Sequence, residues 1–254
     1  EILFMAIVIA LFWCMDKRKG YYLMTVGFFG IVANQFLKLV FRVSRPWIRD
    51  PEFTIVEGAR AGATGYSFPS GHTQNAAAVL GCPARMARKK GLKITLWVLY
   101  ALVGISRMYL GVHTPYDVGV GVVMGLVLVF GLYPFFSEKN YKPQRMYVLL
   151  GVMLALSSAF TTYTRLYPFP ADIEVDNLSH GIKNGYTLTG AVAGMLAAFW
   201  LDEHYVHFQT AGSLPAHIVK CVVGLGLLLG IKTVLKPPMN ALFGGDPIAD
   251  AFRY

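Results

Sequence analysis

Charge is scarce in this sequence. Asp, Glu, Lys and Arg make up 15% of the 254 residues and 55% are hydrophobic, whereas a typical soluble domain carries about 25% charged residues. The mean hydropathy is +0.50. These values exclude an ordinary soluble domain and indicate a protein of the lipid bilayer.

Acidic residues are rarer than basic ones, with 14 against 23 and a net charge of +9. A basic chain can bind nucleic acid, but here the cations gather in every second loop between apolar runs, as they do in cytoplasmic loops. These loops hold Lys17, Arg18 and Lys19; Arg85, Arg88, Lys89, Lys90 and Lys93; and Lys139, Lys142 and Arg145. We therefore expect membrane lipids and no nucleic acid as partners, with the intervening loops facing out.

Metal-binding patterns are also missing. Cys14, Cys82 and Cys221 have the spacing of neither a zinc site nor a disulfide framework, so we expect buried small apolar side chains. The segment from Glu203 to His207 contains two histidines but lacks the order of a zinc-protease helix. We interpret it as a solvated cytoplasmic loop, and we expect no metal and no cofactor.

Apolar runs, by contrast, recur along the whole chain, at 1–14, 21–41, 72–87, 94–112, 115–136, 146–160, 185–201 and 215–235. A helix crosses the bilayer with roughly 20 apolar residues, so the pattern predicts an all-α polytopic membrane protein with about eight transmembrane helices. The first run starts abruptly at Glu1 without an initiator Met, and we expect the natural start to lie upstream. Residues 1–136 form the expected catalytic core, and 137–254 supply additional helices and a C-terminal segment.

Glycine pairs spaced four apart occur in three of these runs. They are Gly121 and Gly125, Gly190 and Gly194, and Gly226 and Gly230. Such pairs let neighbouring helices approach closely, so we expect them to serve helix packing.

Polar residues interrupt the apolar pattern at three places. Lys38 and Arg45, seven residues apart, would share one face if the helix persisted that far, but Pro46 disfavours helical geometry at Arg45. Two neighbouring cations in a membrane protein indicate a bound anion. Alternatively, they reach from a helix end to the lipid headgroups.

The second place is Pro69-Ser70-Gly71-His72, directly before an apolar run. The pattern predicts a helix N-terminus, where free amides bind anions, Gly71 permits close approach and His72 presents an imidazole. A plain helix cap by Ser70 explains the tetrapeptide equally well.

The third place runs from Ser106-Arg107 to His113 and Asp117. Thr114, Pro115 and the acidic Asp117 form a good helix start, so Asp117 could be merely a capping carboxylate. Alternatively, Asp117 accepts a hydrogen bond from His113 and orients a nucleophilic nitrogen. The basic loops place all three motifs at the outer membrane face, independently of the motifs themselves.

Together, Lys38-x6-Arg45-Pro46, Pro69-Ser70-Gly71-His72 and Ser106-Arg107-x5-His113-x3-Asp117 resemble the signature motifs of the type 2 phosphatidic acid phosphatase superfamily. This superfamily includes bacterial acid phosphatases and vanadium haloperoxidases, whose helical core the resemblance implies for this chain. The segment from Tyr66 to Thr73 is most similar to the integral-membrane lipid phosphatases of bacteria, which implies a bacterial plasma membrane with the active site facing out.

The resemblance implies a metal-independent hydrolase acting on a phosphorylated lipid through a phosphohistidine. It assigns His113 as nucleophile, Asp117 as its partner and His72 as general acid and base. The implied phosphate ligands are Lys38, Arg45, Ser70, Gly71 and Arg107. Fixed cations would then stabilise the charge that a magnesium ion neutralises elsewhere.

Other functions use the same residues. A lipid phosphotransferase would pass the phosphoryl group to an alcohol, a transport or binding protein would keep the pocket without turnover, and haloperoxidase activity belongs to soluble relatives. The sequence leaves the lipid open among undecaprenyl pyrophosphate, phosphatidylglycerol phosphate, phosphatidate and sphingoid phosphates, and it predicts no oligomeric state.

Overall fold

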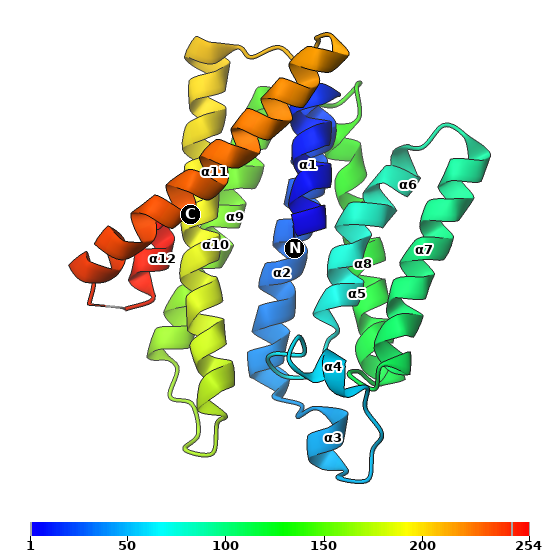
Figure 1. The fold of residues 1–254 in the computed structure, drawn as a ribbon, viewed down its shortest axis with the longest axis vertical. Helices are drawn as coiled ribbons and strands as arrows, with labels where there is room; N and C mark the ends of the chain where they lie inside the picture. Colours follow the sequence, from blue (N-terminus) through cyan, green and yellow to red (C-terminus); the bar gives the residue numbers. More distant parts are fainter. Residues whose placement is uncertain (1, 245, 254) are drawn as a thin grey trace. The chain divides into compact units, whose positions relative to one another are not determined.

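The computed structural model describes residues 2–244 and 246–253, which form helices and loops without any strand. The α-helices are α1 (Ile2–Cys14), α2 (Lys17–Phe41), α3 (Pro46–Arg49), α4 (Glu57–Arg60), α5 (Gly71–Ala76), α6 (Cys82–Met86), α7 (Lys90–Tyr109), α8 (Pro115–Phe136), α9 (Pro143–Leu166), α10 (Val175–Leu201), α11 (Leu214–Leu242) and α12 (Ile248–Arg253); η1 (Ala77–Gly81) and η2 (Asp202–Val206) are π-helical turns. The expected all-α class is confirmed (Figure 1).

The chain forms two compact units, and each unit is built from more than one segment of the sequence. The motif unit comprises residues 22–134 and 169–181, and the flanking unit comprises 1–21, 135–168 and 182–254. The division expected after residue 136 lies close to the boundary at 134, but residues 1–21 and 169–181 belong to the unit on the other side of it.

Five helical segments of the described residues are long and apolar enough to cross a membrane. They are Lys17–Arg49, Lys90–Tyr109, Pro115–Phe136, Pro143–Leu166 and Leu214–Leu242. The protein is therefore an integral membrane protein, while the count of eight transmembrane helices stays a prediction. α1, the short α5–α6 segment and α10 are the three expected spans outside this set.

The helix that carries Lys38 ends earlier than Pro46 alone requires. α2 stops at Phe41, and Arg42 takes a left-handed backbone with φ of 48°. Lys38 and Arg45 therefore do not share a helix face, because four non-helical residues, 42–45, follow the helix end. Pro46 instead opens the short helix α3, where a proline is well tolerated.

The predicted helix start at the second motif is confirmed. Ser70 caps α5 and its hydroxyl accepts the amide of Thr73. After α5 the helix widens into the π-helical turn η1 and continues as α6, in which Pro83 is the second residue. Because Pro83 has no amide hydrogen, it cannot continue the regular hydrogen-bond ladder, which accounts for the irregular turn before it.

Glycines on α8 let that helix lie close to α5 and η1. A Cβ added at Gly121 would stand 2.9 Å from the carbonyl oxygen of Ser70, and one at Gly125 would stand 2.6 Å from Ala77 Cβ. The expected packing role of this pair is thus confirmed. No atom lies within 4 Å of the added Cβ at Gly226 or Gly230, so the expected contact is not made there.

In the flanking unit, aromatic side chains from four helices meet. Tyr21 of α2 contacts Phe12 and Phe199 edge-on, with ring centroids 4.8 and 5.4 Å apart, and Tyr147 contacts Phe199 at 4.9 Å. The Lys17 ammonium pairs with the buried Asp202 carboxylate. These contacts join residues at the start of α2 to α9 and the end of α10.

Three expectations differ from the structure in whole or in part. The stretch between the apolar runs at 146–160 and 185–201, expected to be a loop facing out, is largely helical, because α9 runs to Leu166 and α10 begins at Val175. Among the cysteines only Cys82 is buried; Cys14 and Cys221 are half-buried free thiols 3.5 Å apart. The segment from Glu203 to His207 is exposed at its last four residues, as expected, but most of it lies in η2 rather than in a loop. The His204 ring lies 5.0 Å from the Trp200 ring at an interplanar angle of 31°.

The close approach of α8 predicts a sharp difference between two of its glycines. Gly125→Leu should lower the thermal unfolding midpoint of the detergent-solubilised protein by several degrees, because the new side chain has no room against Ala77. Gly131→Leu is the matched control, since nothing lies within 4 Å of its Cβ position. Equal midpoints for the two variants would contradict this packing.

Candidate active site

The three sequence motifs meet at one end of the motif unit. α2 and α7 end there, and α5 and α8 begin there (Figure 1). A cavity of about 330 Å³ lies among them, lined by Arg45, Val56, Gly58, Ala59, Gly62, Ala63, His72, Arg107, Leu110, Val112 and His113. Four nitrogen-bearing side chains from the motifs therefore face one space, and the described lining residues include no acidic one.

A tight turn between α7 and α8 places His113. Gly111 has φ of 73°, and a Cβ there would stand 2.6 Å from the Thr54 carbonyl oxygen. The Val56 amide donates to the Leu110 carbonyl over 3.2 Å, which joins the loop after α3 to this turn. Glycine is required at position 111 both by its left-handed backbone and by the adjacent chain.

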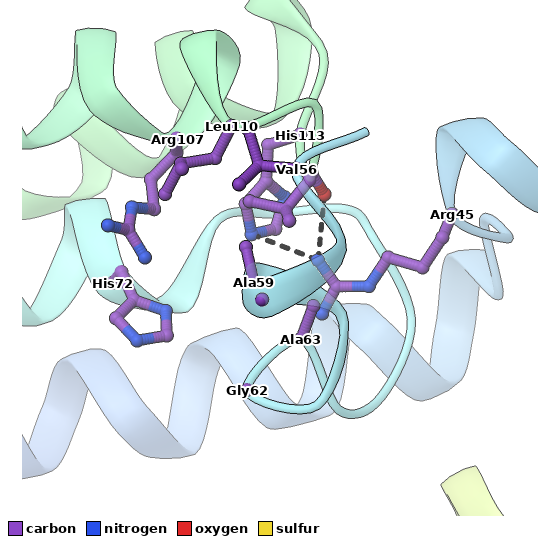
Figure 2. Close-up of a pocket in the computed structure, with 11 residues that line it drawn as sticks. Arg45, Val56, Ala59, Gly62, Ala63, His72, Arg107, Leu110 and His113 are labelled. Carbon is purple, nitrogen blue, oxygen red and sulfur yellow. Dashed lines mark hydrogen bonds between the residues drawn. The ribbon is translucent and has the colours of Figure 1, made fainter. Parts of the chain in front are cut away.

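Arg45 is held in place by backbone carbonyls. Its Nε donates to Gly65 O over 2.9 Å, its Nη2 to Thr64 O over 2.7 Å, and its Nη1 to Val112 O over 2.9 Å. Nη1 also lies 3.1 Å from Nε2 of His113 (Figure 2). The guanidinium is therefore pre-positioned, with one N–H directed at the imidazole.

This contact identifies the tautomer of His113. A guanidinium only donates hydrogen bonds, so Nε2 must accept and carries the lone pair. The ring proton then sits on Nδ1, which lies 3.5 Å from Oδ2 of Asp117. That distance is long for a hydrogen bond, but it leaves the carboxylate as the nearest anion to the Nδ1 proton.

Asp117 serves as the capping carboxylate that the sequence offered, while its role of orienting a nucleophilic His113 stays a prediction. Its Oδ2 accepts the Thr114 amide over 2.7 Å, as a helix-capping carboxylate does, and the same oxygen faces His113. Oδ2 also accepts the Ser67 hydroxyl over 2.6 Å. The Asp117 carbonyl accepts the Ser70 amide over 2.9 Å, which ties the start of α5 to α8.

His72 and Arg107 form another wall of the cavity. Both side chains lie on the same side of the space that His113 faces, with the Arg107 guanidinium near the His72 ring (Figure 2). His72 is solvent-exposed, and Arg107 Nε lies 3.3 Å from the Ser106 hydroxyl. This arrangement leaves His72 accessible to water and to a ligand.

Three predicted phosphate ligands lie elsewhere. The amine of Lys38 is buried and donates to the Tyr66 carbonyl. Ser70 is fully buried, and its hydroxyl lies 2.9 Å from that of Thr73. Gly71 opens α5 but, like Lys38 and Ser70, is not among the residues that line the cavity.

The surroundings of His113 keep its imidazole neutral. Burial lowers the pKa of His113 to about 4, and the nearby Arg45 and Lys38 act in the same direction, while Asp117 acts against them. Protonation would place a further cation in a buried cationic site. Above about pH 5 the ring is therefore neutral and its Nε2 lone pair is available.

The sequence motifs did not predict two parts of the site: the wall formed by residues 56–63 and the hydrogen bond from Ser67 to Asp117. The segment from Val56 to Ala63 forms that wall with small residues, and no motif distinguished it from any glycine-rich loop. Ser67, which bonds Asp117, lies between the first two motifs and gave no signal of its own. Among the described residues, no group of three metal-ligating side chains comes together.

The family is shown by two matching models. Residues 18–141 match the PAP2 superfamily, and residues 186–254 match the PAP2 superfamily phosphatase transmembrane extension. Together these ranges cover most of the chain, and the chain belongs to the PAP2 superfamily. No solved structure gives a significant match.

Curated relatives are similar to the chain over part of its length. Phosphatidylglycerophosphatase B of Bacillus subtilis is 38% identical over 113 residues, which are 40% of this chain and 53% of the relative. Lipid A 4'-phosphatase of Porphyromonas gingivalis is 36% identical over 101 residues, 38% and 42% of the two chains. Undecaprenyl-diphosphatase BcrC of B. subtilis is 29% identical over 120 residues, 47% and 59%. The chain thus spans about half the length of these relatives.

The environment of His113 predicts an unusual titration. In ¹⁵N-labelled protein in detergent, the His113 resonance, identified by its loss in His113→Ala, should stay that of a neutral ring down to about pH 5 and titrate near pH 4. Asp117→Asn should lower this pKa further, because the carboxylate acts to raise it. A midpoint at about 6.5, the ordinary histidine value, would contradict the geometry.

Proposed function

We propose that the chain is a lipid phosphate or pyrophosphate phosphatase that works through a phosphohistidine. One observation carries the proposal. The unprotonated Nε2 of His113 and the Arg45 N–H that it accepts are 3.1 Å apart at the edge of the cavity. A nucleophile and a cation thus converge on one point, which suits attack on a phosphate whose charge must be stabilised.

In the proposed first step, the Nε2 lone pair of His113 attacks phosphorus and a P–N bond forms. The bond from phosphorus to the lipid oxygen breaks, and His72 donates a proton to that oxygen. Asp117 stabilises the positive charge that develops on the His113 ring. Arg45 and Arg107 stabilise the negative charge on the other phosphate oxygens.

In the second step, His72, now neutral, takes a proton from water as the water oxygen attacks phosphorus. The P–N bond breaks, inorganic phosphate leaves, and His113 returns to its neutral form with Nδ1 still protonated. The exposure of His72 to solvent supports this role, because water must reach it.

For Lys38, Ser70 and Gly71, the role of phosphate ligand rests on the family resemblance. None of them lines the cavity, so each would reach a phosphate only after a local shift. Arg45 and Arg107 are the two cations that the geometry supports directly as phosphate ligands.

The proposed substrate is a phosphorylated lipid in the outer leaflet. The names of the relatives support this class, since they act on phosphatidylglycerophosphate, lipid A and undecaprenyl diphosphate. The basic turn between α6 and α7 lies at the end of the motif unit opposite the cavity (Figure 1). Because basic loops face the cytoplasm by the positive-inside rule, this arrangement supports a cavity on the extracytoplasmic side.

A phosphate-release panel tests the proposed activity. Purified protein should release inorganic phosphate from at least one of phosphatidylglycerol phosphate, phosphatidate, lipid A and undecaprenyl diphosphate, and His113→Ala should abolish the release. Phosphate appearing on an added alcohol instead of in solution would indicate a phosphotransferase. Full activity in His113→Ala would overturn the nucleophile assignment.

His72→Ala should slow lipid hydrolysis on the order of 10²–10⁴-fold, as expected for a lost general acid. The loss should be smaller for p-nitrophenyl phosphate, whose leaving group departs without protonation. In wild type, kcat/KM should rise as the pH increases past the low pKa of His113, and it should fall at higher pH when His72 loses its proton. An equal loss for both substrates would contradict the general-acid role.

The orientation has its own test. With Cys14, Cys82 and Cys221 replaced by alanine, a cysteine at the exposed Glu52 should react with a membrane-impermeant maleimide in intact cells. A cysteine at Lys90, in the basic turn, should react only after permeabilisation. The reverse pattern would place the cavity in the cytoplasm.

A further inference from the structure

We propose that Ser67 is a positioning residue that acts on His113 through Asp117. This inference rests on the proposed function, because it concerns the readiness of His113 to attack. It also adds a residue outside the three motifs to the site. Ser67 does not line the cavity and would touch no substrate.

Three groups surround one oxygen of Asp117. Oδ2 accepts the Ser67 hydroxyl over 2.6 Å and the Thr114 amide over 2.7 Å, while Nδ1 of His113 lies 3.5 Å away. Ser67 is fully buried and Asp117 is 2% exposed, so water does not replace a lost donor there. The two short hydrogen bonds therefore determine where Oδ2 sits relative to the His113 ring.

The position of Ser67 is itself fixed from α2. Its amide donates to the Val43 carbonyl over 2.7 Å, directly after the end of that helix. The carbonyl of the preceding residue, Tyr66, accepts the buried Lys38 amine. Ser67 thus connects the segment that carries Lys38 and Arg45 to the carboxylate behind His113, and it aligns the first motif with the third.

Removing the hydroxyl should have two separable effects. Without the Ser67 donor, the Thr114 amide still holds Oδ2 beside the His113 ring, but the carboxylate can rotate about this bond and the ring is less well oriented. Oδ2 would also become a stronger acceptor for His113, which would raise the pKa of His113. The other charged or titratable groups around His113 are Arg45, Lys38, Arg107 and His72, and Ser67→Ala leaves all four in place.

The test compares Ser67→Ala with Ser157→Ala in the full chain in detergent. Ser157 is an equally buried serine whose hydroxyl bonds the Leu154 carbonyl in α9, in the flanking unit. Ser67→Ala should lower kcat roughly 10- to 100-fold, by analogy with the losses found when the hydrogen-bond partners that orient metal-ligating histidines are removed. KM should change little, and the acid limb of the pH profile should move to higher pH. Ser157→Ala should match wild type in kcat, in KM and in the position of the acid limb.

Ser67→Thr keeps the hydroxyl and should recover most of kcat and the wild-type acid limb. If Ser67→Ala does not fold, Ser67→Cys carries the comparison, because it has nearly the same volume and a much weaker donor. Lower kcat in a folded variant with an unmoved acid limb would mean a merely structural role and would overturn the inference.

The same experiment separates this inference from the proposed function. If wild type hydrolyses lipid phosphate, His113→Ala is inactive and Ser67→Ala equals wild type, only the role of Ser67 fails. If His113→Ala is as active as wild type, the phosphohistidine mechanism fails, and the positioning role fails with it.

Discussion

A buried carboxylate joins the separate parts of this site. Asp117 caps α8 through the Thr114 amide, faces the ring proton of His113, accepts the Ser67 hydroxyl, and binds the start of α5 through its carbonyl. An ionised group in such a place is costly unless it is surrounded by donors. Since one of these donors, the Ser67 hydroxyl, lies fifty positions away in the sequence, the segment before α5 must meet the start of α8 to satisfy the carboxylate.

The cavity in front of His113 is lined by cations and imidazoles, whereas the group behind His113 is a carboxylate. Arg45, Arg107 and two histidines face it, and Arg45 is held by carbonyls from three backbone positions. A guanidinium fixed before the ligand arrives stabilises charge without reorganising during the reaction. The His113 ring is kept neutral by burial and by the nearby cations Arg45 and Lys38. The same cations that would attract an anionic substrate therefore also keep His113, the proposed nucleophile, unprotonated.

The elements at this end of the motif unit were largely predictable, because caps and prolines are local signals. Ser70 as a cap and Pro115 as the start of α8 follow from short-range rules. The end of α2 at Phe41 did not follow, since it depends on the left-handed backbone of Arg42. The start of α10 at Val175 was missed because its first turns are polar. The contact of Ser67 with Asp117 joins residues fifty positions apart, and no local pattern reports it.

The central claim is that His113 carries the phosphoryl group. Its most direct test is rapid acid-free quenching of wild-type protein during turnover of a lipid substrate, followed by mass spectrometry of the peptide containing His113. The account predicts a transient phosphoryl group on Nε2 of His113 that is labile to acid and stable to base. Turnover with no phosphorylated peptide at any quench time, or with the phosphoryl group on another residue, would contradict it.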